Sequence, residues 1–372
     1  MSSRQRQPFC APISISDSTK ATFRARLLAW YDAHARDLPW RQSSDPYRVW
    51  LSEIMLQQTR VTAVIAHYHE FLRRFPTVEK LARGREAGVL AAWSGLGYYR
   101  RARMLHAAAK VVVRKRNGKF PASAEELRKL PGVGRYTAAA IASIGFGEAV
   151  AVVDGNVERV LQRVSGERLA GEELWRAAEG LLDHERPGDF NQAMMELGAV
   201  VCTPRAPACL TCPVVGLCAT RGELPGAVKA ARQKKREIHY ALDFRSSDYR
   251  SGAVFLVQRP QDSRLMAGMW ELPEVEGPSG AKARSNGAGK VAALKALRHP
   301  KARGRDSAGA WLTLKHSITV TNYIVRVWRM SAPPSDEGKW IPVERLTRVA
   351  LTGLARKILR KAEIIAGHDR QV

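Results

Sequence analysis

The sequence predicts a mainly α-helical N-terminal domain followed by a smaller α+β domain. From residue 21 to about residue 221, apolar residues recur every three or four positions, as within Trp50–Met55, which is the spacing of helices that bury one face. Beyond that part, Ala253–Val257 and Tyr323–Trp328 are rich in β-branched and aromatic residues, which indicates strands. A chain of 372 residues fits two or three domains.

Composition divides the chain into a disordered lead-in, the helical domain, a basic linker and the second domain. These segments span residues 1–20, 21–224, 225–240 and 241–372. The helical domain closes with a cysteine-rich loop at residues 202–218. In the second domain, residues 277–310 are rich in Gly, Ala, Lys and Arg and are loosely specified, with one candidate helix at Val291–Leu297. The tail, Leu351–Ile365, has helical periodicity.

The charge balance points to a polyanionic partner. The chain carries 60 Lys and Arg against 35 Asp and Glu, a net charge of +25 with a pI near 10.4. Nucleic acid is the expected partner, because basic side chains neutralise phosphates and release counterions. No apolar run is long enough to span a membrane, and the N-terminus lacks the apolar core of a signal peptide. We expect a cytoplasmic, nucleoid-associated protein.

Four of the five cysteines lie within seventeen residues. Cys202, Cys209, Cys212 and Cys218 are spaced C-x6-C-x2-C-x5-C. Disulfides are disfavoured because nothing indicates export to an oxidising compartment. Four converging thiolates indicate a metal or iron–sulfur site. Only the central pair has the short spacing that structural zinc sites favour, so the spacing alone leaves zinc and an iron–sulfur cluster equally open.

A glycine hairpin between two predicted helices is a candidate grip on a phosphate backbone. The segment Leu130–Thr137 reads Leu-Pro-Gly-Val-Gly-Arg-Tyr-Thr. Gly132 and Gly134 allow the main chain around Val133 to approach a phosphate, and the following helix offers free N–H groups and the positive end of its dipole. An ordinary corner between two helices is the competing interpretation.

These features together resemble the endonuclease III superfamily of helix–hairpin–helix DNA glycosylases. The hairpin, then Val153–Val157 (Val-Asp-Gly-Asn-Val), then the four cysteines follow one another as in that superfamily. Within it, Leu51–Thr59, Asp37–Arg41 and Gly95–Tyr99 look like the MutY family of adenine glycosylases. The match is dense over residues 22–220. It implies a helix–hairpin–helix glycosylase domain whose cysteine loop holds a [4Fe-4S] cluster.

The resemblance implies excision of adenine mispaired with 8-oxoguanine or guanine in duplex DNA, by a monomer. Cutting this N-glycosidic bond needs a general acid to protonate adenine and a carboxylate to stabilise an oxocarbenium-like sugar. The adenine must also be flipped out of the duplex. Two carboxyl groups in unlike surroundings meet this demand.

Glu53 and Asp154 are the candidate pair. Glu53 lies in a strongly apolar helical segment, where loss of solvent would raise its pKa, although most helical glutamates simply face solvent. Asp154 precedes Gly155 and an apparent helix, so it also suits an N-cap. Both roles are compatible. In the family this aspartate is catalytic and the asparagine at position 156, Asn156, helps to organise the site.

Tyr136 separates the reaction types. In bifunctional relatives the corresponding position of the hairpin motif holds a lysine, which forms a Schiff base and leads to strand cleavage. A tyrosine cannot form that imine, so a monofunctional enzyme is expected. A packing role for the tyrosine is the competing interpretation. The alternatives for the whole chain are a bifunctional glycosylase and AP lyase, and a non-catalytic iron–sulfur DNA-binding protein.

The resemblance also implies the residues that contact the bases. Arg41 and Glu196 would contact the flipped adenine. Tyr98 would wedge into the base stack, although aromatics after Gly-Leu-Gly also suit a core. The positions that would meet the base opposite adenine are Gln58, Thr59, Leu96 and Tyr98.

The C-terminal domain resembles the Nudix-like module of the same family. The resemblance rests on Leu265–Pro273, and no glutamate-rich catalytic Nudix helix is evident, so we expect lesion recognition and not hydrolysis. In the family, a Phe-Ser-His loop senses 8-oxoguanine. The matching place here is Ile318-Thr319-Val320, where Thr319 supplies a hydroxyl and Val320 replaces the histidine. This replacement puts the strength of discrimination in doubt.

Overall fold

The computed structural model describes residues 16–224, 234–245, 252–263, 265–277, 309–318, 321–335 and 337–365. The chain forms two compact units. Unit 1 comprises Met1–Arg83 and Met104–Val228, and unit 2 comprises Gly84–Arg103 and Lys229–Val372. The predicted division at residues 224–240 therefore changes in one respect, because the segment 84–103 from the predicted helical domain packs with the C-terminal residues.

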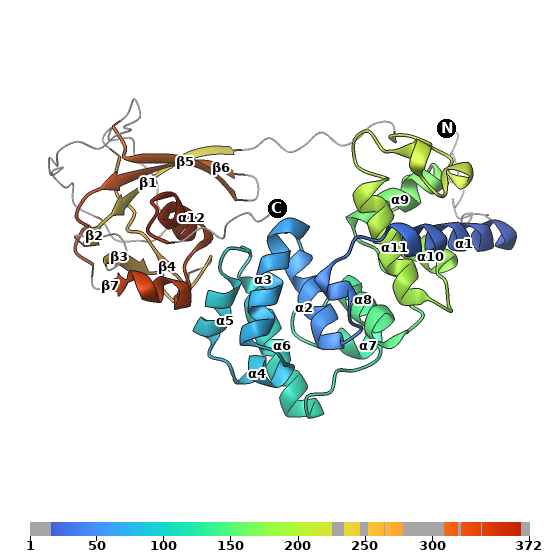
Figure 1. The fold of residues 1–372 in the computed structure, drawn as a ribbon, viewed down its shortest axis with the longest axis horizontal. Helices are drawn as coiled ribbons and strands as arrows, with labels where there is room; N and C mark the ends of the chain where they lie inside the picture. The colour runs from blue at the N-terminus through green and yellow to red at the C-terminus, as the bar shows by residue number, and fades with distance from the viewer. Residues whose placement is uncertain are drawn as a thin grey trace, which may run out of the picture. The chain divides into compact units, whose positions relative to one another are not determined.

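Unit 1 is helical, as predicted. Its helices are α1 (Asp17–His34), α2 (Pro46–Leu56), α3 (Val61–Arg74), α4 (Val78–Arg83), the part of α6 (Arg100–Arg116) from Met104 on, α7 (Ala124–Leu127), α8 (Arg135–Phe146), α9 (Gly155–Ser165), α10 (Glu172–Leu181) and α11 (Pro187–Val200). Short 3-10 turns lie at Pro39–Arg41, Cys209–Thr211 and Val215–Leu217. Helices α1, α9, α10 and α11 form one group and α2, α3, α7 and α8 another, joined where α11 contacts α8 (Figure 1).

The predicted lead-in extends too far into the chain. Helix α1 begins at Asp17, where the Ser16 hydroxyl accepts a hydrogen bond from the N–H of Thr19 and Asp17 lies in the first turn. A serine cap and an acidic first turn both stabilise a helix start. Residues 17–20 are therefore helical, and residues 1–15 lie outside the described part of the chain.

The core of unit 1 explains how its helices are held at close range. Apolar side chains from α1, α8, α9, α10 and α11 form one buried cluster. Helix α8 contributes Ala139 and Ala140 to this cluster, and its Ala138 and Ala142 are also fully buried. Small side chains allow neighbouring helices to approach closely. Cys202 and Cys212 of the cysteine loop pack against this same cluster, so the loop is an extension of the core.

Unit 2 contains two small sheets. Strands β1 (Lys234–Leu242), β6 (Thr321–Arg329) and β5 (Leu312–Ile318) form one sheet in the order β1-β6-β5, with β1 parallel and β5 antiparallel to β6. In the other, β3 (Ala253–Gln258) pairs with β2 (Phe244–Arg245), β4 (Trp270–Glu271) and β7 (Gly338–Pro342), all antiparallel. The predicted strands at residues 253–257 and 323–328 are thus confirmed.

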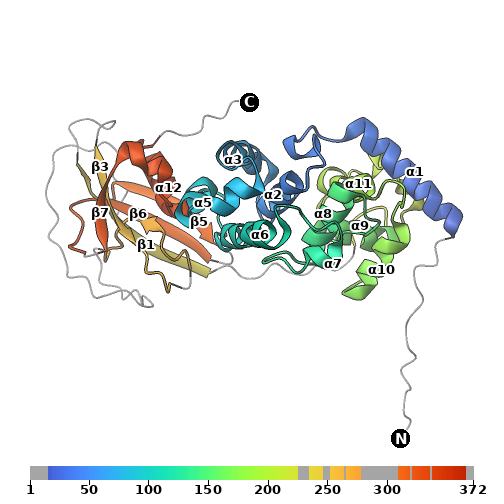
Figure 2. The same ribbon diagram turned by 90° about the horizontal axis from the view of Figure 1, so that it is seen from below.

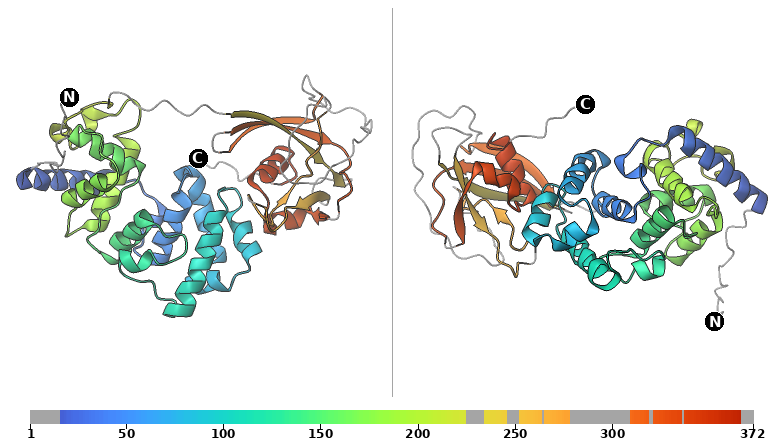
Figure 3. Two further views of the ribbon diagram at one scale, coloured as in Figure 1. Left: turned by 180° about the vertical axis from the view of Figure 1, so that it is seen from behind. Right: turned by 60° about the horizontal axis from the view of Figure 1, so that its bottom comes forward.

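Helices complete unit 2. Helix α12 (Gly353–Lys361) shares a buried core with strands of both sheets, and it lies against them in both views of Figure 3. Helix α5 (Glu86–Trp93) contacts the 3-10 turn at Val343–Arg348 and lies near the strands of this unit in Figure 2. The predicted helical tail is therefore shorter than residues 351–365.

The basic linker predicted at residues 225–240 overlaps strand β1, which begins at Lys234. The first four residues of β1 are exposed and its last three are buried. The basic residues at its exposed start resemble a linker, although β1 pairs along its full length with β6. The candidate helix at 291–297 lies outside the described residues. Among the described residues, no helix is long and apolar enough to cross a membrane.

Candidate active site and its supporting elements

Glu53 is buried on the helix that the sequence singled out. Helix α2 starts with Asp45, whose carboxylate accepts the N–H of Tyr47, and with Pro46 in the first turn, both favourable at a helix start. Every residue from Val49 to Met55 is buried, and Glu53 is 6% exposed. Burial raises the pKa of Glu53 from 4.5 to about 7, with a further rise from the charge of Asp154. Near neutral pH this carboxyl therefore holds a proton that it can deliver.

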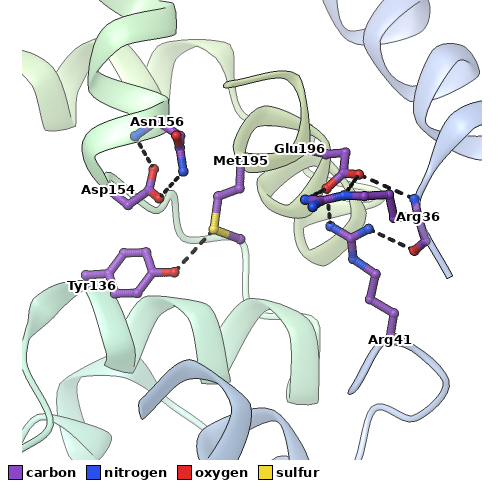
Figure 4. A network of polar contacts seen from close by, with 7 residues as sticks. All are labelled: Arg36, Arg41, Tyr136, Asp154, Asn156, Met195 and Glu196. Carbon is purple, nitrogen blue, oxygen red and sulfur yellow. Dashed lines mark hydrogen bonds and ion pairs between the residues drawn. The ribbon is translucent and has the colours of Figure 1, made fainter. Parts of the chain in front are cut away.

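Tyr136 lies against Glu53. Its hydroxyl donates to Glu53 Oε2 at 2.6 Å. The same hydroxyl lies 3.2 Å from the sulfur of Met195, the contact that is drawn in Figure 4. Burial and the neighbouring carboxylates raise the pKa of Tyr136 well above its usual value. The phenol therefore stays neutral and acts as a hydrogen-bond donor that fixes the orientation of the Glu53 carboxyl.

Asp154 is an N-cap whose second oxygen is also fixed. Its Oδ1 accepts the N–H groups of Asn156 and Val157 at 2.9 and 2.8 Å, and its Oδ2 accepts Asn156 Nδ2 at 2.9 Å. These three donors fix both oxygens of the Asp154 carboxyl at the N-terminus of α9. The predicted N-cap is confirmed, and the structure brings Asp154, Asn156, Tyr136 and Glu53 into one site.

Glu196 forms an ion-pair cluster next to this site. It is 1% exposed, and its Oε1 accepts Arg36 Nε at 2.6 Å while its Oε2 accepts one nitrogen each of Arg36 and Arg41 at 2.7 and 2.8 Å (Figure 4). Burial opposes ionisation of Glu196, but Arg36 and Arg41 outweigh it and hold its pKa at about 2. The predicted adenine contacts, Arg41 and Glu196, are thus paired with each other.

Arg159 ties the Asp154 side of the site to the cysteine loop. Its guanidinium donates to Asn156 Oδ1 at 2.9 Å, to the Gly198 carbonyl at 2.6 Å and to the Cys202 carbonyl at 2.7 Å. The sequence reasoning missed Arg159, Arg36 and Met195. Arg159 lies on α9 one turn after Asn156, and Met195 directly precedes Glu196, so their positions beside predicted residues were the available signal.

The four predicted ligand cysteines face a common cavity. Cys202, Cys209, Cys212 and Cys218 line it together with Arg163 and Arg221. Arg163 donates to Cys202 Sγ and the Arg221 N–H to Cys218 Sγ, each at 3.4 Å. Within the described ranges, no three Cys, His or carboxylate side chains are grouped so as to hold a metal ion. Four thiols around one cavity, with N–H donors to sulfur, nevertheless fit the donor set of an iron–sulfur cluster.

The hairpin has the conformation that its glycines suggest. Gly132 has φ +75°, and a Cβ built there would lie 2.5 Å from Met104 Cβ. Gly134 caps α8 without a side-chain hydrogen bond, and a Cβ there would meet nothing within 4 Å. Val133 is buried between them. The main chain at Gly134 is therefore open to an approaching group, and the first turn of α8 has no side-chain cap.

Two predicted base contacts have a left-handed backbone although they are not glycines. Gln58, at the end of α2, is exposed with φ +55°, and Thr59 is partly exposed beside it. In unit 2, Tyr98 has φ +48° and is 45% exposed, while Leu96 is buried. Such strain in residues with side chains clusters at functional sites. The remaining predicted contact, Thr319, lies outside the described residues.

Comparison with known proteins agrees with the helical site. Residues 51–178 match the family described as HhH-GPD superfamily base excision DNA repair protein. The chain is 42% identical over 313 residues to an adenine DNA glycosylase of Homo sapiens, covering 68% of this chain and 57% of that protein. An adenine DNA glycosylase of Schizosaccharomyces pombe is 33% identical over 319 residues, covering 68% and 69%.

A solved structure supports the fold of the helical part. A thermostable thymine-DNA glycosylase superposes with a TM-score of 0.52 at 31% identity, covering 55% of this chain and 97% of that one. The chain spans about 60% of the length of the mammalian relatives it matches.

Proposed function

The chain belongs to the adenine DNA glycosylase family, and from this premise we propose that it is a monofunctional glycosylase that excises adenine mispaired with 8-oxoguanine or guanine. The observation that carries the proposal is the pairing of a buried, protonated Glu53 with the tyrosine hydroxyl of Tyr136. A protonated carboxyl can serve as a general acid at neutral pH, and a tyrosine at position 136 offers no amine for a covalent intermediate.

The proposed reaction begins with adenine flipped out of the duplex into the site. Glu53 donates its proton to a ring nitrogen of adenine, which turns the base into a neutral leaving group as the bond to C1′ of the sugar breaks. The electron pair of that bond leaves with adenine, and the sugar becomes oxocarbenium-like. The carboxylate of Asp154, fixed by Asn156, stabilises this positive charge. Water then adds to C1′ and gives a proton to the Glu53 carboxylate, which leaves an abasic site and restores the acid form of Glu53.

Base and backbone contacts follow from the supporting elements. Arg41, held by Glu196 and stacked 5.4 Å from the centre of the Tyr31 ring, can offer its remaining N–H groups to the adenine. The Gly132–Gly134 hairpin and the start of α8 would hold a phosphate. Gln58, Thr59, Leu96 and Tyr98 would face the opposite base, with Tyr98 as the exposed wedge.

The cysteine loop is proposed to hold a [4Fe-4S] cluster. The four cysteines that line the cavity would ligate it, with Arg163 and Arg221 as donors to two of the sulfurs. When bound, the cluster would supply a rigid cross-link for a loop that carries the exposed Arg205 and Arg221, which would present positive charge to DNA.

Unit 2 is proposed to be Nudix-like and to recognise the 8-oxoguanine, with Thr319 in the reading loop. We also propose that the protein acts as a monomer in the cytoplasm, associated with the nucleoid.

An excision assay tests the proposal. Duplexes with adenine opposite 8-oxoguanine, guanine or thymine are incubated with excess protein, and free adenine is measured. We expect release from the first two and little from the third. The Glu53→Gln variant should lose at least ~100-fold in rate, whereas Glu158→Gln, at an exposed position on α9, should not. Absence of adenine release from the first two duplexes would reject the proposal.

A further inference from the structure

The loop that presents Tyr98 is held in a strained conformation. It joins α5 to α6, and its backbone is left-handed at Gly95 (φ +113°), Gly97 (φ +72°) and Tyr98 (φ +48°). Glycine adopts a left-handed conformation without strain, but a residue with a Cβ such as Tyr98 is disfavoured there and keeps it only where its surroundings hold it. The exposed tip of the loop, Tyr98, therefore depends on the residues that fasten the two ends.

Part of the fastening comes from the adjacent helices. The indole N–H of Trp93 donates to the Gly97 carbonyl at 3.2 Å. Arg101 donates to the Leu96 and Gly97 carbonyls at 3.4 Å each, and its guanidinium lies 5.5 Å from the ring centres of Trp93 and Tyr98. These contacts shape the loop but do not fix it to the rest of unit 2.

The other part comes from a single carbonyl in the C-terminal residues. Ser94, just before the loop, donates its hydroxyl to the Leu351 carbonyl at 2.8 Å, and Tyr99, just after the loop, donates to the same oxygen at 3.2 Å. Arg356 of α12 donates its Nε to the Ser94 hydroxyl at 2.8 Å. Ser94, Tyr99 and Leu351 are all less than 5% exposed, so water does not compete for these bonds.

Leu351 is itself held by the sheet of unit 2. The N–H of Trp270 donates to Ala350 at 2.8 Å, and the N–H of Thr352 donates back to Trp270 at 2.9 Å, so Leu351 forms a β-bridge with Trp270. The Thr352 hydroxyl also caps α12. The carbonyl that receives both ends of the Tyr98 loop is therefore tied to strand β4 and to the start of α12.

We propose that Ser94, Tyr99 and Arg356 are positioning residues that clamp both ends of the Tyr98 loop onto the Leu351 carbonyl. Strand β4 and helix α12 of unit 2 would then determine the position of the Tyr98 side chain. This inference rests on the proposed role of Tyr98 at the opposite base. It places the control of the wedge in residues that touch no base. A displacement of β4 or α12 on lesion binding would move both ends of the loop together.

A double-mutant cycle tests the clamp. The Ser94→Ala/Tyr99→Phe pair removes both hydroxyls and keeps the aromatic ring. Affinity is measured for a duplex with a non-cleavable adenine analogue opposite 8-oxoguanine. With Tyr98 present, the two substitutions together should weaken binding about fivefold. This factor corresponds to the net contribution of one typical hydrogen bond. In the Tyr98→Ala background the two substitutions should have no further effect, because the clamped side chain is gone.

A matched control separates positioning from general destabilisation. Tyr47 is a buried tyrosine in unit 1 whose hydroxyl donates to the Phe75 carbonyl at 2.7 Å, so Tyr47→Phe removes a comparable bond far along the chain from the loop. Amide hydrogen exchange in DNA-free protein should speed up over residues 94–100 in the Ser94→Ala/Tyr99→Phe variant and stay unchanged there in Tyr47→Phe.

The outcomes keep the two proposals apart. Equal loss of affinity in both Tyr98 backgrounds, or unchanged exchange over residues 94–100, would overturn the clamp. If the wild-type chain releases no adenine, the proposed function fails, but the exchange measurement still decides the clamp, since it needs neither substrate nor catalysis.

Discussion

At the scale of single residues, the proposed site depends on the Glu53 carboxyl keeping its proton near neutral pH, where a solvent-exposed carboxyl would be ionised. Glu53 lies among buried side chains of α2 and accepts a hydrogen bond from the Tyr136 hydroxyl. Asp154, by contrast, accepts three hydrogen bonds at a helix start. The two carboxyl groups thus lie in unlike surroundings, which is what a site that holds both an acid and a charge stabiliser requires.

The burial of Glu53 has a measurable consequence for stability. Its pKa is about 7 in the folded chain and 4.5 when exposed, so between these values the unfolded chain binds fewer protons than the folded one. Stability should therefore fall as pH rises from 4.5 to 7, by about 3 kcal/mol in all. Glu53→Gln removes this dependence, and its melting temperature should exceed that of the wild type by a margin that grows up to pH 7 and then levels off.

We expect the same titration to govern the proposed reaction. The single-turnover excision rate should fall about tenfold per pH unit above pH 7, as the acid form of Glu53 is lost. Glu158→Gln, an exposed change on α9, should alter neither the melting curve nor the rate profile. A Glu53→Gln protein that is less stable than the wild type at pH 8 would contradict the assigned environment.

At the scale of elements, the two glycines of the hairpin have different roles: Gly132 is required by packing, and Gly134 leaves the main chain open to a ligand. Gly132→Ala would place a Cβ 2.5 Å from Met104 Cβ in a left-handed backbone, which should cost at least about 2 kcal/mol of stability. Gly134→Ala meets nothing within 4 Å and should leave the melting temperature within about 2 °C. It should nevertheless weaken duplex binding about tenfold, because a methyl group there obstructs the approach of a phosphate. Unchanged binding by Gly134→Ala would remove the hairpin from the DNA interface.

The cysteine loop is an element whose cofactor can be counted. Purified protein should contain about four iron and four sulfide per chain. Cys212→Ser should lose both and lower the stability of unit 1, because Cys212 packs on its core. Cys10→Ser is the matched control, since Cys10 lies outside the ligand set, and it should retain the full content. One zinc per chain without sulfide would assign the loop to a structural zinc site.

At the scale of the whole molecule, the sequence predicted what is local and missed what is distant. Glu53, Asp154 and Tyr136 each stand within a short motif, so their places could be read from neighbours. The partners Arg36 and Glu196 are 160 positions apart, and Ser94 and Leu351 are 257 apart. Such pairs form only when elements that are distant in the sequence meet in the fold, so a local sequence pattern cannot predict them.

The same reason explains where the predicted boundaries moved. Charge at the start of β1 suggested a linker, although pairing with β6 makes it a strand. Residues 84–103 looked like part of the helical domain, although α5 and its loop pack with the C-terminal residues. Periodicity identifies an element but not the unit that it joins.

The central claim is that Glu53 acts as an acid beside Tyr136 and that no amine attacks the sugar. The most direct measurement is a single-turnover time course on a duplex with adenine opposite 8-oxoguanine, in which released adenine, strand breaks and borohydride-trapped protein are followed in the same sample. We predict adenine release with the strand intact until alkali is added, and no trapped complex above the level of Glu53→Gln. Strand breaks and trapped protein that rise in step with adenine release would contradict it.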